Sequence, residues 1–280
     1  MFFSEEIKII FVDIDGTFRN NNRQITKDSI NAVKELQDTN ILVVLTSGRS
    51  RKYVEKIAKE AGTSEFIISS NGAEIYNFKE NTVIYSETID KISMKQVCEL
   101  ANAKNVHYAI TSEDKKYMNY TQKNLEIDEI LIEDIEEQIN NIKPVQIVVS
   151  DTKFDKIKEM RNEIEKIREI YPANMHKSLI NEKFSKEGTI YYDLVKKGVN
   201  KGKAIEYFLK YIGVSINKVA AIGDSDNDLD MIKIAGLGIA MGNATEKLKQ
   251  NADWVTLDNE EDGFSFAVKK ILEHNRNYKK

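Results

Sequence analysis

The sequence predicts an α/β protein in which a mainly parallel sheet is built from both ends of the chain and interrupted by a separate α+β segment. Short apolar segments alternate with amphipathic segments of helical period near the N-terminus, and the same alternation returns near the C-terminus. The middle of the chain departs from this spacing. Strands and helices that alternate at such intervals form βαβ units, whose strands lie parallel in one sheet.

The N-terminal alternation predicts three strands and two helices. The helices begin at Thr26 and Ser50, residues typical of helix starts, and the second is closed by Gly62. The predicted strands cover 7–14, 41–47 and 65–69, and the predicted helices cover 26–37 and 50–61.

The C-terminal alternation completes the same sheet. A helix that ends at Gly213 precedes an apolar strand, and the chain then alternates again to a last helix that includes Ala267, Val268 and Ile271. The predicted helices cover 200–212 and 227–236, and the predicted strands cover 218–224, 237–242 and 252–258.

The middle segment has the character of an inserted α+β unit. Strand-like runs occur at 82–87, 106–111 and 144–151, and a charged amphipathic stretch at 153–171 predicts one long helix. The expected organisation is a first core part at residues 1–83, an insert at 84–190 and a second core part at 191–280.

Composition limits the classes of function. With 280 residues and 41% hydrophobic content the chain can bury ordinary cores, and its net charge of −4 does not favour a nucleic-acid surface or a polybasic membrane anchor. Glu5 and Glu6 precede the first apolar run, unlike a signal peptide, and no apolar run approaches membrane-spanning length. We therefore expect a soluble cytoplasmic protein whose single cysteine, Cys98, is a buried structural thiol.

Two carboxylates at the end of the first strand indicate chemistry. Asp13 and Asp15 stand two apart, so they point the same way if the strand continues, and an Asp-Gly turn needs only one of them. Two negative charges there repel and lose hydration, so a cation or an altered protonation state is expected to compensate them.

Further acidic residues follow a later strand. Asp224 and Asp228 come directly after the run at 218–223, and the carboxyl ends of parallel strands share one edge of a sheet. Carboxylates, main-chain carbonyls and water are the oxygen ligands that Mg²⁺ takes, usually with phosphate. Asp226 and Asp230 fit a simpler role as acidic residues in the first turn of a helix.

Two other positions could hold phosphate. Ser47 and Gly48 end the second strand just before a helix, where a hydroxyl and main-chain N–H groups can bind an anion. Lys201 lies in a turn at the start of a helix, and a solvated surface lysine is the alternative there.

These residues also form an ordered set of motifs that resembles the haloacid dehalogenase superfamily and, within it, the Cof-like phosphatases. The four motifs of the family stand here as Asp13-Ile14-Asp15-Gly16-Thr17, Ser47-Gly48-Arg49, Lys201-Gly202 and Gly223-Asp224-Ser225-Asp226-Asn227-Asp228. "SSNGA" at 69–73, "AMGNA" at 240–244 and "EDGF" near the C-terminus are subsidiary features of the resemblance. Phe18 and Arg19 depart from it, because leucines are usual there.

The resemblance implies a Rossmann-like core with an inserted α/β cap that selects substrate, and hydrolysis of small phosphorylated metabolites. It implies that Asp13 is the nucleophile, that Asp15 is the general acid and base, and that Ser47 and Lys201 hold the transferred phosphoryl group. The implied ligands of Mg²⁺ are Asp13, the Asp15 main-chain carbonyl and Asp224. The implied supporting residues are Asp228 at the metal and Gly48 and Asn227 at the phosphate.

Two nucleotide-binding motifs fit the residues poorly. The segment 198–204 has too few residues between its glycines for a P-loop, and 236–242 has one residue too many for a dinucleotide motif. A phosphomutase of the same superfamily and a non-catalytic sensor of phosphorylated metabolites remain open, and free phosphate release would separate them from a phosphatase. The sequence does not indicate the substrate or the oligomeric state.

Overall fold

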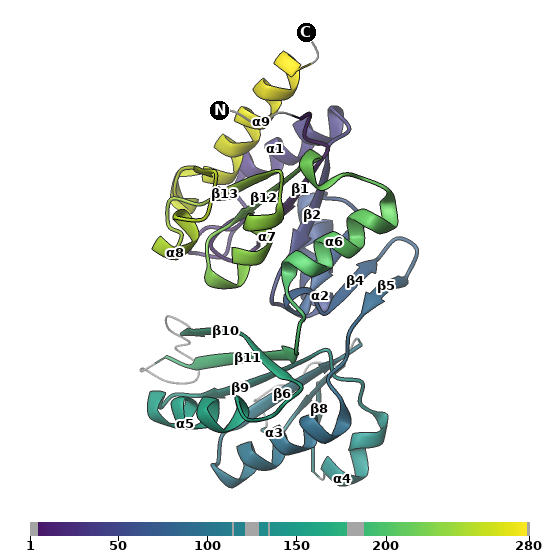
Figure 1. Cartoon of the computed structure of the whole chain (residues 1–280), viewed down its shortest axis with the longest axis vertical. Helices are drawn as coiled ribbons and strands as arrows, with labels where there is room; N and C mark the ends of the chain where they lie inside the picture. The colour runs from purple at the N-terminus through teal and green to yellow at the C-terminus, as the bar shows by residue number, and fades with distance from the viewer. Residues whose placement is uncertain (1–4, 114, 121–128, 134, 178–187, 279–280) are drawn as a thin grey trace. The chain divides into compact units, whose positions relative to one another are not determined.

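In a computed structural model of the chain, both ends of the sequence contribute to one unit and the middle forms a second (Figure 1). The structure describes residues 5–113, 115–120, 129–133, 135–177 and 188–278. The first unit contains Met1–Ile84 and Asn200–Lys280, and the second contains Tyr85–Val199. The second unit therefore continues past the expected boundary at 190, because the strand that starts there pairs within it.

The first unit is built on an eight-stranded sheet of order β14-β13-β12-β1-β2-β3-β4-β5. The pairs from β14 to β3 are parallel, and β4 runs antiparallel to β3. The strands are β1 (Ile9–Val12), β2 (Leu42–Thr46), β3 (Phe66–Ser69), β4 (Glu74–Asn77), β5 (Thr82–Ser86), β12 (Val219–Gly223), β13 (Leu237–Ala240) and β14 (Trp254–Val255). The predicted α/β class with a parallel-dominated sheet is confirmed.

Helices cover this sheet, so β1 is buried along its whole length. Helix α1 packs on α9, and α6 packs on α7. The helices are α1 (Lys27–Asp38), α2 (Arg51–Ala61), α6 (Lys201–Ile212), α7 (Leu229–Ile234), α8 (Glu246–Lys249) and α9 (Gly263–Tyr278). Thr26 caps α1 through its hydroxyl, and Gly62 and Gly213 end α2 and α6 at positive φ as the sequence predicts.

The packing of α6 brings Lys201 to the first strand. The ring of Phe208 in α6 meets the ring of Phe11 edge to face at 6.0 Å, so α6 lies on the face of the sheet to which Phe11 points. Alternate residues of a strand share a face, and Asp13 is two residues beyond Phe11. Lys201, the first residue of α6, therefore starts next to Asp13.

The second unit is a six-stranded sheet of order β10-β11-β9-β6-β7-β8. The described pairs are antiparallel except β7 with β8. The strands are β6 (His107–Ser112), β7 (Lys115–Met118), β8 (Glu129–Leu131), β9 (Gln146–Asp151), β10 (Ile170–Lys177) and β11 (Ile190–Lys196), and the helices are α3 (Lys91–Ala103), α4 (Ile135–Gln138) and α5 (Phe154–Ile164). Cys98 lies in the apolar core between α3 and this sheet, and is fully buried.

The helix predicted for 153–171 is shorter in the structure. Helix α5 ends at Ile164, and strand β10 begins at Ile170, where it pairs with β11. Ile167 packs against the same core from the turn between them. The helical spacing of apolar residues thus continues beyond the helix itself.

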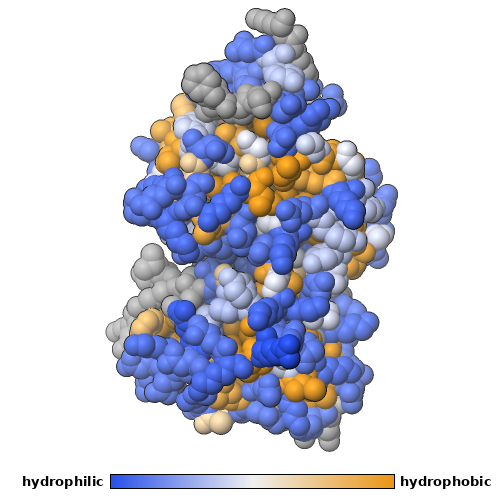
Figure 2. All heavy atoms as spheres, in the orientation of Figure 1, coloured by the Kyte–Doolittle hydropathy of each residue, from blue (hydrophilic) through white to orange (hydrophobic). Residues whose placement is uncertain are grey.

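The surface agrees with the polar composition. Hydrophilic side chains dominate the face seen in Figure 2, with hydrophobic residues in separate patches. None of the helices in the described part of the chain is both long and apolar enough to cross a bilayer.

Candidate active site

The residues singled out in the sequence gather at one edge of the first sheet. Strands β12, β1 and β2 are parallel neighbours, so the loops that follow them share the carboxyl edge of the sheet. Asp13 follows β1, Ser47 follows β2, and Asp224 follows β12. This is the edge at which open α/β sheets bind ligands.

Lys201 joins two of the carboxylates. Its ammonium nitrogen lies 2.5 Å from Oδ1 of Asp13 and 2.5 Å from Oδ1 of Asp228, and its side chain is fully buried. Burial alone would lower the pKa of this ammonium, but the charges of Asp13 and Asp228 outweigh burial and raise the pKa above its usual value. Lys201 is therefore a permanently charged part of the site, which excludes the surface role considered from the sequence.

Asp228 has hydrogen bonds at both of its carboxylate oxygens. Oδ1 accepts from Lys201, and Oδ2 accepts from the main-chain N–H groups of Asp224 and Ser225, each at 3.0 Å. The side chain also lies against Gly223, where a Cβ atom would be 2.6 Å from the Cβ of Asp228. Asp228 thus fixes the loop that carries Asp224 and orients Lys201.

Asp224 lies against the loop that follows β1. Its Oδ1 accepts a 2.6 Å hydrogen bond from the hydroxyl of Thr17, and a Cβ atom at Gly16 would be 2.5 Å from its Oδ2. Gly16 also has a φ of +92°, which side chains rarely adopt. Gly16 therefore leaves room for the Asp224 carboxylate and Thr17 binds it, so the last two residues of the Asp13–Thr17 motif allow Asp224 to lie close to Asp13.

The donor set fits a divalent cation. Asp13, Asp224 and Asp228 each offer an oxygen, and these atoms lie within 4.8 Å of one another. Burial raises the pKa of Asp13 well above its ordinary value, with Lys201 opposing and the other two carboxylates adding to the rise. Burial, reinforced by Asp228 and opposed by Thr17, raises the pKa of Asp224 to about 7. A cation bound between Asp13 and Asp224 would offset this crowding of negative charge.

Asp15 has a different environment. Its side chain is 33% exposed, its Oδ2 lies 2.8 Å from Nε of Arg49, and its Oδ1 lies 3.9 Å from Nη1 of Arg19. Tyr53 accepts a hydrogen bond from Arg19, and its ring lies 5.2 Å from the guanidinium carbon of Arg49. Asp15 is thus bound by arginines and lies outside the group formed by the other aspartates of the site.

The second strand contributes Ser47 and Gly48. Ser47 is buried, and its Oγ accepts a 3.2 Å hydrogen bond from the main-chain N–H of Arg49. Gly48 lies against Asn71, since a Cβ atom there would be 2.9 Å from the Asn71 Oδ1. Asn71 Oδ1 in turn accepts a 2.9 Å hydrogen bond from Asn227, so the predicted phosphate-binding residues are linked across the site.

Asn243, in the subsidiary motif at 240–244, and two residues outside the subsidiary motifs, Thr245 and Asn259, support the same loops. Asn243 donates a 2.8 Å hydrogen bond to the carbonyl oxygen of Gly16, and Asn259 donates its main-chain N–H to Asn243 at 3.1 Å. The main-chain N–H of Thr245 donates to the carbonyl oxygen of Asp224 at 2.9 Å. These hydrogen bonds fix the main chain of the first motif at Gly16 and of the fourth motif at Asp224.

The residues near the site that were missed as individual candidates from the sequence include Thr17, Arg19, Arg49, Tyr53 and Asn71. Thr17 and Asn71 lie within stretches that the motif comparison quoted, so a signal for them was present. Tyr53 lies in α2 with no local sign of its contact with the arginines.

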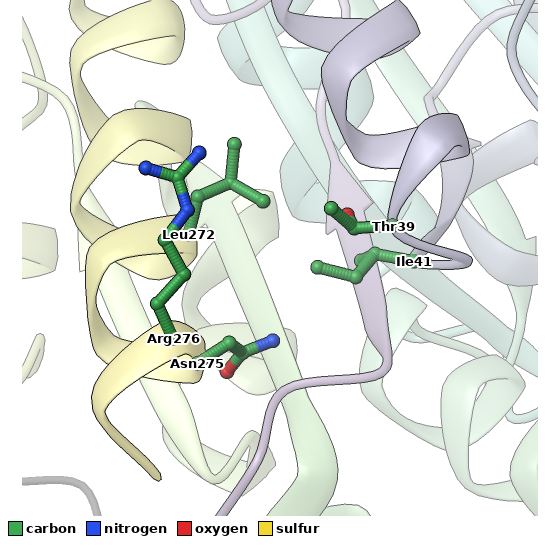
Figure 3. A pocket seen from close by; sticks show the side chains of 5 residues that line it. All are labelled: Thr39, Ile41, Leu272, Asn275 and Arg276. Atoms are coloured by element: carbon green, nitrogen blue, oxygen red, sulfur yellow. The ribbon is translucent and has the colours of Figure 1, made fainter. Parts of the chain in front are cut away.

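A small hollow elsewhere in the first unit is not part of this site. It is lined by Thr39, Ile41, Leu272, Asn275 and Arg276 (Figure 3). Ile41 precedes β2 whereas Ser47 follows it, so the hollow lies at the opposite end of that strand. Its volume of about 60 Å³ is far below the roughly 300–1,000 Å³ of pockets that bind metabolites.

Comparison with known proteins decides the family. The family model described as haloacid dehalogenase-like hydrolase matches residues 10–268. The chain belongs to the haloacid dehalogenase-like hydrolase family. The resemblance predicted from the motifs is thereby confirmed, and with it the expectation of an enzyme.

Relatives in this family are named as phosphatases. Phosphatase YwpJ of Bacillus subtilis (strain 168) is 29% identical, and the match covers 95% of this chain and 100% of the relative. The 5-amino-6-(5-phospho-D-ribitylamino)uracil phosphatase YcsE of the same organism is 28% identical, with 94% of this chain and 95% of the relative covered. The chain is thus a hydrolase of the phosphatase type.

Solved structures of family members share the fold. A haloacid dehalogenase-like hydrolase from B. subtilis has a TM-score of 0.79 at 25% identity, over 94% of this chain and 99% of that chain. The phosphatase BT1666 from Bacteroides thetaiotaomicron has a TM-score of 0.78 at 25% identity, over 95% of both chains. The family fold therefore extends over almost the whole sequence, including the inserted unit.

Proposed function

We propose that this haloacid dehalogenase-like hydrolase is a Mg²⁺-dependent phosphatase that acts on small phosphorylated metabolites through an aspartyl-phosphate intermediate. The observation that carries the proposal is the group of Asp13, Asp224 and Asp228 at the carboxyl edge of a parallel sheet, in which Asp13 and Asp228 are buried and joined by Lys201. Such a group is costly to bury unless it binds a cation and an anionic substrate.

Asp13 is the proposed nucleophile. One of its oxygens attacks phosphorus, a bond forms between that oxygen and phosphorus, and the bond to the ester oxygen breaks. Oδ1 of Asp13 already holds the Lys201 ammonium at 2.5 Å, which fixes the side chain and leaves Oδ2 for the attack. Lys201 also neutralises charge that the attacking carboxylate and the phosphoryl oxygens share.

Asp15 is the proposed proton donor and acceptor. In the first step its carboxyl group donates a proton to the leaving ester oxygen, and in the second it accepts a proton from the water that attacks the phosphorylated Asp13. The second step releases inorganic phosphate and restores Asp13. Arg49, 2.8 Å from Asp15, orients the carboxylate for both transfers.

Ser47, Gly48, Lys201 and Asn227 are the proposed partners of the transferred phosphoryl group. They would position it in line with Asp13, and positioning together with charge stabilisation supplies most of the catalysis in phosphoryl transfer. Bound Mg²⁺ would be held by Asp13, the main-chain carbonyl of Asp15 and Asp224, with Asp228 in support, and would offset the charge of phosphate and carboxylates.

The second unit is proposed to select the leaving group. The expected insert, residues 84–190, differs in architecture from the sheet that carries the acidic residues, and binding segments appended to a rigid scaffold commonly set specificity. The chemical class proposed for the substrate is a small phosphate monoester, in line with relatives named for a phosphorylated ribitylamino compound. Exchanging the insert for another without a change in substrate preference would contradict this assignment.

The test measures phosphate release from sugar phosphates, nucleotides, pyridoxal phosphate and flavin mononucleotide, with Mg²⁺ or with chelator. Asp13→Asn should abolish release, and Asp226→Asn is the matched control because Asp226 lies in the same acidic stretch with an exposed side chain. Metal-dependent release that Asp13→Asn removes and Asp226→Asn retains would support the proposal. Transfer of the phosphoryl group to a second sugar without free phosphate would indicate a phosphomutase, and binding without turnover would indicate a sensor.

A further inference from the structure

The loop after β3 is strained and buried beside the proposed active site. Ser70, Asn71 and Gly72 have consecutive positive φ values of 50°, 57° and 95°. Ser70 and Asn71 are each only 1% exposed. Non-glycine residues in this region cost about 1–3 kcal/mol each, and such strain persists at functional sites where the surroundings enforce it.

This loop is bonded to the loop that carries Ser47. The main-chain N–H of Asn71 donates to the carbonyl oxygen of Ser47 at 3.0 Å, and that of Ser70 donates to the carbonyl oxygen of Arg49 at 2.9 Å. Gly48 lies between them with no room for a Cβ atom beside the Asn71 amide. The backbone of 47–49 is therefore set by the backbone of 70–71.

The side chain of Asn71 reaches the loop after β12. Its Oδ1 accepts a 2.9 Å hydrogen bond from Nδ2 of Asn227, while the Oδ1 of Asn227 accepts from the hydroxyl of Ser225 at 3.1 Å. Asn227 stands directly before Asp228, whose carboxylate holds Lys201. Asn71 thus connects three loops, through its main-chain N–H to the loop after β2 and through its amide oxygen to the loop after β12.

We propose that Asn71 is a positioning residue that fixes Asn227 and the loop 47–49 relative to each other, so that their groups meet one phosphoryl group. The inference rests on the proposed phosphatase function and adds a residue that the motifs do not assign to it. Asparagine suits the position because it tolerates a left-handed backbone and carries an amide oxygen that can accept from Asn227.

The test compares Asn71→Gly with Asn40→Gly. Glycine accepts the left-handed backbone and removes the side chain with its amide. Asn40 is an exposed asparagine with a similar backbone, at φ 58°, before β2, so Asn40→Gly controls for the added freedom of glycine. We expect Asn71→Gly to lower kcat by about 10- to 100-fold, since small misplacements at a phosphoryl site have effects of that size. Asn40→Gly should stay within about twofold of the wild type, as expected of a surface change.

A double-mutant cycle tests the route through Asn227. If Asn71 acts through that residue, Asn71→Gly in an Asn227→Ala background should lower kcat/KM little further than Asn227→Ala alone. Effects that multiply in the double variant would overturn the proposal. So would a kcat for Asn71→Gly that matches the Asn40→Gly control.

Hydrogen exchange separates failure of this proposal from failure of the proposed function. We expect Asn71→Gly to speed the exchange of main-chain amides in 47–50 and in 224–228, and Asn40→Gly to leave them unchanged. Unchanged exchange in both loops would refute the positioning role, whether or not the enzyme is active. If the wild type releases no phosphate from any ester, the phosphatase proposal fails, and the exchange result still decides the role of Asn71.

Discussion

Replacing Lys201 by methionine should destabilise the first unit as well as inactivate the enzyme. Methionine has a similar length and no charge, so the substitution removes the ammonium and leaves Asp13 and Asp228 facing each other without their cation. Lys201 is fully buried, and water therefore cannot replace the ammonium without rearrangement of the site. Lys203→Met, at an exposed position in the same turn of α6, is the matched control.

The size of the effect follows from two short contacts. Each carboxylate oxygen is 2.5 Å from the ammonium nitrogen, and an effective dielectric constant of about 20 gives roughly 7 kcal/mol of attraction per pair. Desolvation of the three charges cancels much of this, and loss of one partner from a buried pair usually costs about 3–5 kcal/mol. We expect Lys201→Met to lower the free energy of unfolding by about this amount in chelator, and Lys203→Met by less than about 0.5 kcal/mol.

Equilibrium urea unfolding followed by tryptophan fluorescence measures this loss in the correct part of the chain. The chain has one tryptophan, Trp254 in β14, so the signal reports the first unit. Addition of Asp228→Asn to Lys201→Met removes one of the two opposed charges and should restore part of the stability without restoring activity. A loss below about 1 kcal/mol, or a double variant no more stable than Lys201→Met, would refute the account of Lys201 as the cation that holds the acidic group together.

Three further outcomes are expected. Gly16→Ala should lower the free energy of unfolding by about 1–3 kcal/mol and weaken Mg²⁺ activation, because its Cβ atom would lie 2.5 Å from Oδ2 of Asp224. Gly62 also has a positive φ but has open space around its Cβ position, so Gly62→Ala should lower stability without weakening Mg²⁺ activation. Equal Mg²⁺ activation of the Gly16→Ala and Gly62→Ala variants would contradict the contact between residue 16 and Asp224. Mg²⁺ at 100 times its Kd should stabilise the folded protein by about 2.7 kcal/mol in thermal or urea unfolding, and Asp224→Asn should remove that gain. Cys98 should resist Ellman's reagent at pH 8 until urea unfolds the chain. Burial raises the pKa of its thiol to about 12, which leaves a thiolate fraction of about 10⁻⁴ at that pH. Rapid labelling of the folded protein would contradict this prediction.

The fold and the strand-end residues were predictable because their signals are local. A buried strand is a short apolar run, and the residue that follows it is readable from the same few letters, as for Asp13, Ser47 and Asp224. Parallel neighbours then bring these ends to one edge without any knowledge of side-chain contacts. The positions of Gly62 and Gly213 were predictable for the same reason, since a helix that ends at positive φ favours glycine.

The predictions that differ from the structure concern strands that pair with segments distant in the sequence. The stretch 165–169 continues the helical spacing of apolar residues, but β10 competes for the residues that follow by pairing with β11, a strand 20 residues later. The pattern of apolar residues alone does not distinguish these outcomes. The expected boundary at 190 likewise separates β11 from the sheet to which it is bonded. The sequence of β11 alone does not show that this strand pairs with β9.

The same distinction explains why the environment of each aspartate had to come from the structure. Asp13 and Asp15 are two residues apart in one motif, yet the Asp13 side chain is 7% exposed and bound to Lys201, whereas the Asp15 side chain is 33% exposed and bound to Arg49. Their partners come from α6 and from the loop after β2, far along the chain in both cases. The proposed nucleophile lies against a fixed cation and the proposed proton carrier is open to solvent, and these two roles need such different surroundings. The different surroundings of the two carboxylates are therefore a product of tertiary packing, and under the proposed mechanism changes to Lys201 and to Arg49 should affect different steps of the reaction.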